Sequence, residues 1–150
     1  MYETCVTASE AAYLLRHRHG LPVELFAGHV LVTCNSQLGA VRMPSGLGRR
    51  VLPGLIHDRP VPAVANPRET HWTLLVDPRP PISVESNHEA QLSKYDVALL
   101  QHGYRVWLPT SDTGIGWHWI TEPAPSPLLL PPLPSVLSTI YRLLKQAAIP

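Results

Sequence analysis

The chain has 150 residues, 45% hydrophobic and 15% charged, which excludes a disordered polyelectrolyte and allows one domain with a hydrophobic core. A formal net charge of +1 provides no overall electrostatic attraction to duplex DNA. No apolar run is long enough to span a bilayer, and the first residues lack the pattern of a signal peptide. We therefore expect a cytoplasmic protein that does not engage a membrane.

Seventeen prolines predict many short elements, because proline ends helices and is confined to the edges of sheets. The capping-box pattern at 7–10 predicts a helix over about 9–19, which Gly20 ends in a left-handed conformation. Residues 21–26 and 29–33 are then expected to form a hairpin around Ala27 and Gly28. Cys34, like Cys5, is expected to be a free, partly buried thiol.

The middle of the chain alternates between strand and helix signals. Residues 38–43 are expected to form a third strand, and 45–55 a helix that Ser45 caps and Pro53 shortens. Two further strands, 61–65 and 70–76, are joined by a turn at 66–69. Residues 87–92 are expected to form one helical turn.

From Tyr95 to Pro123 the sequence predicts three short strands joined by glycine-bearing turns, with Asp96 at the start of the first. The proline-rich segment 122–134 is expected to be extended, and Ser135 to cap a final amphipathic helix. These elements together predict one α+β domain over 1–150, with a mostly antiparallel sheet flanked by an N-terminal and a C-terminal helix.

Several short blocks carry a resemblance to a known family. They are Pro60–Val64 with Asn66–Arg68, His71–Val76, Asp96–Leu99, Gly103–Ser111 and Trp117–Pro123. The order of these blocks resembles the N-terminal domain of actinobacterial bifunctional DNA primase/polymerases, which belong to the archaeo-eukaryotic primase-like proteins. The resemblance covers about residues 30 to 145. It implies that His71 corresponds to a histidine that contacts the incoming nucleotide, and Asp96 to the third metal-binding carboxylate.

The same comparison reveals a missing motif. Catalysis by such enzymes requires two divalent ions held by carboxylates, two of which come from an Asp-x-Asp pair on one strand. The corresponding segment here, Gly39–Met43, has no acidic residue. One carboxylate at Asp96 cannot hold two metal ions, so we expect no catalytic residues, no metal site and no cofactor, with Mg²⁺ needed only if the chain is active.

Other residues are weaker candidates for ligand binding. Arg49 and Arg50 follow glycines and a serine, a composition that suits phosphate contacts, although the spacing is not that of a P-loop. Ser111 ends the hydroxyl-rich block of the family resemblance. Trp117 and Trp119 share one side of a strand, where they would form either a core pair or a stacking platform for bases.

Three functions remain open from the sequence. The first is a non-catalytic primase/polymerase-like domain that binds a nucleotide or single-stranded nucleic acid through His71, Asp96, Arg49, Arg50 and Ser111. The second is a module that uses the proline-rich segment and the final helix to bind a protein partner or a second copy. The third is an active nucleotidyltransferase in which Asp58, Glu69 or Asp77 replaces the missing acids.

Overall fold

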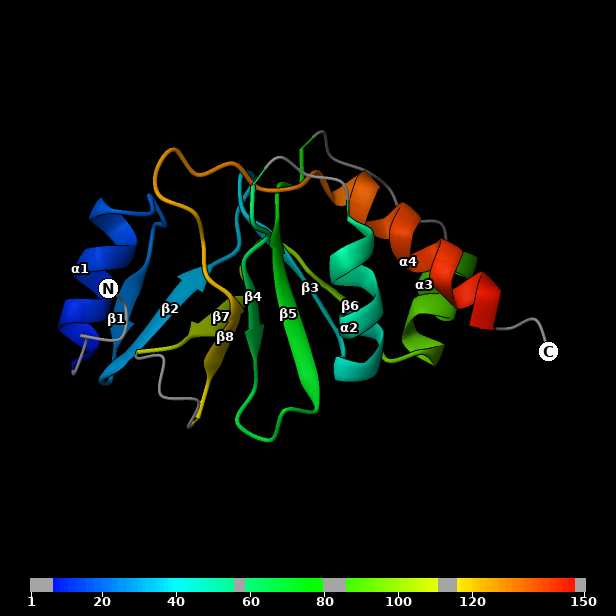
Figure 1. The fold of residues 1–150 in the computed structure, drawn as a ribbon, viewed down its shortest axis with the longest axis horizontal. Coiled ribbons are helices and arrows are strands. Elements are labelled where there is room, and N and C mark those ends of the chain that lie inside the picture. Colours follow the sequence, from blue (N-terminus) through cyan, green and yellow to red (C-terminus); the bar gives the residue numbers. More distant parts are fainter. Residues whose placement is uncertain (1–6, 56–58, 80–85, 111–115, 148–150) are drawn as a thin grey trace.

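The computed structural model describes residues 7–55, 59–79, 86–110 and 116–147. Their elements, in chain order, are α1 (Ala8–His17), β1 (Glu24–Phe26), β2 (His29–Thr33), β3 (Gly39–Pro44), α2 (Ser45–Gly54), β4 (Ala63–Ala65), β5 (His71–Val76), α3 (Ser86–Lys94), β6 (Ala98–Leu100), β7 (Arg105–Leu108), β8 (His118–Thr121) and α4 (Leu133–Ala147). Figure 1 shows α1 at one end of the molecule and α2, α3 and α4 at the other, with the strands between them.

The strands form two antiparallel sheets. The smaller has the order β1-β2-β7 and the larger the order β6-β3-β5-β4-β8. The predicted α+β class, with antiparallel strands and helices at both ends of the chain, is confirmed. The smaller sheet joins segments far apart in the sequence, because Thr33 of β2 pairs with Arg105 of β7.

The N-terminal helix and the first hairpin follow the local sequence signals. The Thr7 hydroxyl accepts a hydrogen bond from the Glu10 amide at 3.1 Å, as in a helix N-cap. Gly20 lies beyond the helix with φ +72°, as expected for a left-handed end. Ala27 and Gly28 both have positive φ, which matches the two-residue turn favoured between twisted strands.

Each face of the larger sheet contributes to a different hydrophobic core, because successive side chains on a strand point to opposite sides. Val41, Leu74 and Val76 pack in one core with α2 and α4. Ala40 and Leu75 face the other core, which includes α1, β2 and β7. This second core does not cover the end of the sheet at which β5 begins. There Arg42 is exposed and His71 is partly exposed. The uncovered part of the sheet carries the candidate site.

The proline-rich segment lies along the protein rather than away from it. The Ser126 amide donates to the Arg18 carbonyl at 2.7 Å, and His19 Nδ1 lies 3.1 Å from the Ala124 carbonyl oxygen. Leu128 and Leu130 pack against the core that contains α1. Figure 1 shows the segment passing over the sheets from β8 to α4.

Several local predictions differ from the structure at element boundaries. The single helical turn expected over 87–92 is a helix of nine residues, α3. Pro44, and not Ser45, is the N-cap residue of α2, and no side chain caps that helix. The final helix begins at Leu133, two residues before Ser135, since prolines are tolerated in a first helical turn that needs no amide donors. Asp96 lies outside the strand, because its φ of +59° is incompatible with extended backbone and β6 begins only at Ala98.

Candidate functional site

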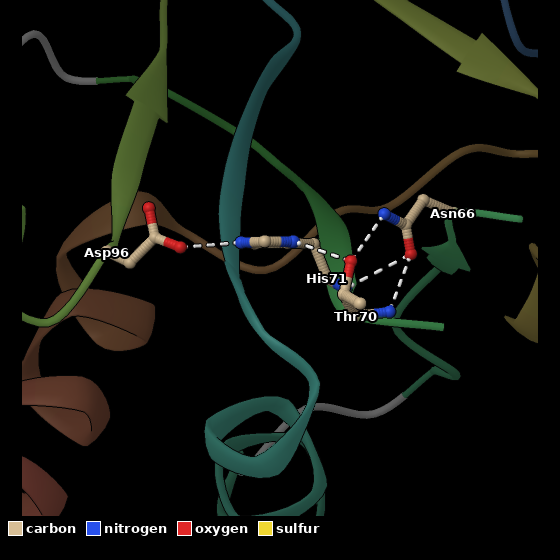
Figure 2. A network of polar contacts seen from close by, with 4 residues as sticks. All are labelled: Asn66, Thr70, His71 and Asp96. Carbon is tan, nitrogen blue, oxygen red and sulfur yellow. Dashed lines mark hydrogen bonds and ion pairs between the residues drawn. The ribbon is translucent and has the colours of Figure 1, made fainter. Parts of the chain in front are cut away.

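His71 and Asp96, 25 residues apart in the sequence, form a hydrogen-bonded pair on the uncovered part of the larger sheet. His71 Nε2 lies 2.6 Å from Asp96 Oδ2. His71 is the first residue of β5, and Asp96 lies in the turn between α3 and β6. Figure 2 shows the imidazole extending across the β3 ribbon toward the carboxylate.

The sheet register explains how two residues on non-adjacent strands meet. Strand β3 lies between β5 and β6, and its Pro44 pairs with His71. On the other side Arg42 pairs with Ala98, the first residue of β6, and Asp96 lies in the turn two residues before it. The two side chains thus bridge two strand spacings, about 10 Å.

A polar network in the β4–β5 turn fixes the other side of the imidazole. His71 Nδ1 lies 3.0 Å from Thr70 Oγ1, which accepts a hydrogen bond from Asn66 Nδ2 at 2.8 Å (Figure 2). The Asn66 Oδ1 atom accepts from the amides of Thr70 and His71 at 2.8 and 3.1 Å, so the orientation of the Asn66 amide is fixed. Since Thr70 Oγ1 accepts from Asn66, its own proton is available for His71 Nδ1. In the neutral imidazole, this arrangement leaves the proton on Nε2, where it donates to Asp96.

Asn66, His71 and Asp96 help to line a surface pocket of about 330 Å³, called here the sheet-face pocket. Its lining residues are Arg42, Asn66, His71, Thr73, Asp96 and Trp117. Arg42 and Thr73 are register partners on β3 and β5, so they project from the same face. The pocket therefore combines a guanidinium, an imidazole, a carboxylate, a hydroxyl, an amide and an indole.

The electrostatic environment favours the ionised carboxylate of Asp96. The hydrogen bond from His71 is the largest effect and lowers the pKa of Asp96 below the ordinary value of 3.8. Desolvation opposes it, and the nearby charges of His71 and Arg42 make smaller contributions that lower the pKa. The Asp96 side chain is 64% exposed and that of His71 is 30% exposed. The pair is therefore accessible to a ligand in the sheet-face pocket.

A second imidazole–carboxylate pair lies in the same region and was not predicted from the sequence. His118 Nε2 lies 3.0 Å from Glu69 Oε1, and His118 Nδ1 lies 3.0 Å from the Gly116 carbonyl oxygen. Glu69 belongs to the β4–β5 turn with φ +56°, and His118 begins β8 beside Ala65. The contact depends on the turn conformation and on strand register, neither of which has a short sequence motif.

Arg49 and Arg50, which were also predicted to bind the ligand, do not line the sheet-face pocket. Arg49 lies on α2 with its guanidinium carbon 5.6 Å from the centre of the Trp72 ring, and Trp72 belongs to the core on the opposite side of the sheet from His71. Arg50 is exposed on the same helix. Ser111 lies outside the described residues. Trp117 and Trp119 both pack against the core that contains α1, and Trp117 also lines the pocket.

Of the acids considered as replacement metal ligands, Glu69 and Asp77 lie in the described part of the chain, and neither completes a metal-binding group with Asp96. Asp77 follows the far end of β5, six residues or about 20 Å along the strand from His71, and binds Arg79. Glu69 pairs with His118. Asp58 lies outside the described residues. Within 7–55, 59–79, 86–110 and 116–147, no three His, Cys, Asp or Glu side chains are grouped to hold a metal ion.

No family model, curated protein or solved structure matches the chain. Among the described residues, no helix has both the length and the apolar character needed to cross a membrane.

Proposed function

We propose that this chain is a primase/polymerase-like domain that binds a nucleotide or single-stranded nucleic acid without two-metal catalysis. The observation that carries the proposal is the convergence of Arg42, His71 and Trp117 on one open pocket of an antiparallel sheet. Guanidinium and imidazole groups donate to phosphate oxygens, and an indole face stacks on a base. A cytoplasmic location remains a prediction from the sequence.

The chemistry of the pocket suits recognition better than phosphoryl transfer. Asp96 is the one carboxylate among the lining residues, and it is already engaged by His71. Transfer through two metal ions needs several oxygen ligands that hold the ions about 4 Å apart. Arg42, by contrast, makes no salt bridge with any described residue, is exposed, and lines the same pocket as the imidazole.

Replacing arginines on opposite faces of the sheet tests where the ligand binds. We expect Arg42→Gln to weaken binding of ATP or an oligothymidylate about tenfold, the scale of losing one hydrogen bond to a charged group. Arg50→Gln, on α2, removes the same charge and is expected to change affinity less than about twofold. Isothermal titration calorimetry in the presence and absence of Mg²⁺ measures both.

Either of two results contradicts the proposal. Wild-type protein that binds neither ATP nor oligothymidylate at millimolar concentration has no such function. Equal losses in Arg42→Gln and Arg50→Gln would show that the ligand responds to net charge and not to the sheet-face pocket. Primer extension by the wild-type chain that is lost in Asp96→Ala would instead support the active nucleotidyltransferase.

The interaction module remains the alternative. The apolar residues of α4 that suggested it, among them Val136 and Ile140, are buried within the molecule's own core. Exposed apolar side chains occur elsewhere, at Leu25 and Phe26 on β1 and at Leu129 in the proline-rich segment. Light scattering over a dilution series tests self-association, and a constant monomer mass would count against a second copy as the partner.

A further inference from the structure

Both nitrogens of the His71 imidazole are occupied in the unliganded protein. Nδ1 faces the Thr70 hydroxyl at 3.0 Å, and Nε2 faces the Asp96 carboxylate at 2.6 Å. A phosphate entering the sheet-face pocket therefore cannot receive a hydrogen bond from His71 unless one of these two contacts breaks. The contact that breaks identifies the residue, Thr70 or Asp96, with which the ligand competes for His71.

The Thr70 contact is the more firmly built of the two. Thr70 receives a hydrogen bond from Asn66 on its hydroxyl and donates its amide to the same residue. Asn66 also accepts from the His71 amide, so the hairpin holds imidazole and hydroxyl together. Moving the imidazole away from Thr70 would disturb this turn.

The Asp96 contact is the replaceable one. The Asp96 side chain is 64% exposed, and His71 is its hydrogen-bond partner in the network that Figure 2 shows. Its backbone adopts φ +59°, in the turn that joins α3 to β6. A rotation of this exposed side chain toward water frees His71 Nε2 without moving a strand.

We propose that the Asp96 carboxylate occupies, in the unliganded protein, a phosphate subsite formed by His71 Nε2–H and the Arg42 guanidinium, and that the phosphate of the ligand displaces it. This inference rests on the proposed function. A carboxylate and a phosphate present similar oxygen acceptors, so the same two donors suit both. Arg42 and Asp96 line the same pocket, so the guanidinium is placed to reach an anion bound there, and its charge contributes to the lowered pKa of Asp96. Asp96 is then a competitor of the ligand and not one of its contacts.

Removing the carboxylate should therefore strengthen binding. We expect Asp96→Asn and Asp96→Gly to bind tripolyphosphate and ATP about tenfold more tightly than the wild-type chain, measured by calorimetry in EDTA. The estimate follows from replacing a charge-assisted hydrogen bond by a neutral one, or by none, and from removing one negative charge beside the phosphate. Asn and Gly are both well suited to positive φ, so neither variant strains the turn.

Glu24→Gln on β1 is the matched control, because it also removes one exposed negative charge but in the smaller sheet. We expect its affinity to match that of the wild type within about twofold. Unchanged or weaker binding by both Asp96 variants, while the wild type binds, overturns the competition and leaves the proposed function standing. Absence of binding by the wild type and both Asp96 variants overturns the two together. An equal gain in Glu24→Gln also overturns the competition, since net charge then explains the effect.

Discussion

Asp77 forms a compact ion pair with Arg79 at the end of β5 remote from the sheet-face pocket. Arg79 Nε lies 3.0 Å from Asp77 Oδ1 and Arg79 Nη2 lies 3.0 Å from Oδ2, a two-pronged contact. These hydrogen bonds lower the pKa of Asp77 below its ordinary value of 3.8, against an opposing effect of burial. The folded state thus prefers the ionised carboxylate, which adds stability above pH 3.8 that is lost as the pH falls through the lowered pKa.

We expect Asp77→Asn to lower the thermal midpoint by about 1–4 °C at pH 7, the range for one exposed ion pair in a domain of this size. The difference from the wild type should shrink as the pH falls below about 4 and through the lowered pKa of Asp77, because protonation removes the charge that the variant lacks. Thermal unfolding followed by circular dichroism between pH 7 and pH 2 measures this difference in midpoint. A difference that stays constant down to pH 2 would mean that the carboxylate charge is not the cause.

Cys34 is a buried thiol that should be nearly inert in the folded protein. Burial raises its pKa to about 11 from the ordinary 9.0, so at pH 8 the reactive thiolate is about one hundredth as abundant. In a Cys5→Ser background, we expect Ellman's reagent to label Cys34 at least a hundredfold more slowly in buffer than in 8 M urea. Labelling at the same rate in both solutions would contradict the burial.

The residues of the pocket differ in how far the sequence revealed them. His71 and Asp96 were predicted together through the resemblance, and the structure brings them within hydrogen-bond distance. Arg42 was missed, although it alternates with buried Val41 and Met43 and so had to face the other side of the strand. That alternation was the available signal. Arg49 and Arg50 drew attention through the neighbouring glycines, but Gly48 serves the packing of α2 on Trp72.

At the scale of an element, α2 shows why a glycine is placed inside a helix. A Cβ atom added to Gly48 would lie 2.7 Å from Trp72 Cε3 and 2.9 Å from Cδ2, closer than carbon atoms approach. Glycine therefore allows α2 to pack directly on the indole of β5. Strand β5 is the centre of the larger sheet, so this contact fixes α2 over the sheet.

We expect Gly48→Ala to lower the free energy of unfolding by about 1–3 kcal/mol, as overpacking does, although alanine normally stabilises a helix. Gly46→Ala is the matched control in the same helix, because an added Cβ there meets nothing within 4 Å. That variant should be neutral or up to about 1 kcal/mol more stable. Urea denaturation measures both, and equal effects would contradict the role of Trp72.

Elements with local signals were the ones that the sequence predicted well. The turn at Ala27 and Gly28, the helix after Thr7 and the helix over 45–54 all rest on neighbouring residues. The boundaries of β6 and α4 were less accurate, because the left-handed turn at Asp96 and the prolines around Ser135 shift them. Such shifts depend on tertiary contacts, which no local pattern records.

At the scale of the whole molecule, the sequence predicted one sheet, and the separation into two sheets was not predicted. The pairing of β2 with β7 joins residues more than 70 positions apart. No local pattern specifies β7, rather than another strand, as the partner of β2. The outcome is a central sheet with a core on each face. Leu75 lies in the core with α1, and Ile140 of α4 lies in the other, both fully buried.

A shared sheet should make the two cores unfold together. Leu75 is flanked on β5 by Leu74 and Val76, which belong to the opposite core, so disruption of either core affects the same strand. We expect Leu75→Ala and Ile140→Ala each to lower the free energy of unfolding by about 2–5 kcal/mol. In both variants circular dichroism and tryptophan fluorescence should give one coincident urea transition with an unchanged slope.

Leu25→Ala on exposed β1 is the control for this prediction, with an expected cost below about 1 kcal/mol. Two separate transitions in either core variant would show that the cores fold independently. Coincident transitions would also have a functional consequence. The sheet-face pocket lies on β3 and β5, which both cores support, so its geometry would persist until the whole molecule unfolds. A ligand that binds there should then raise the midpoint of both probes equally.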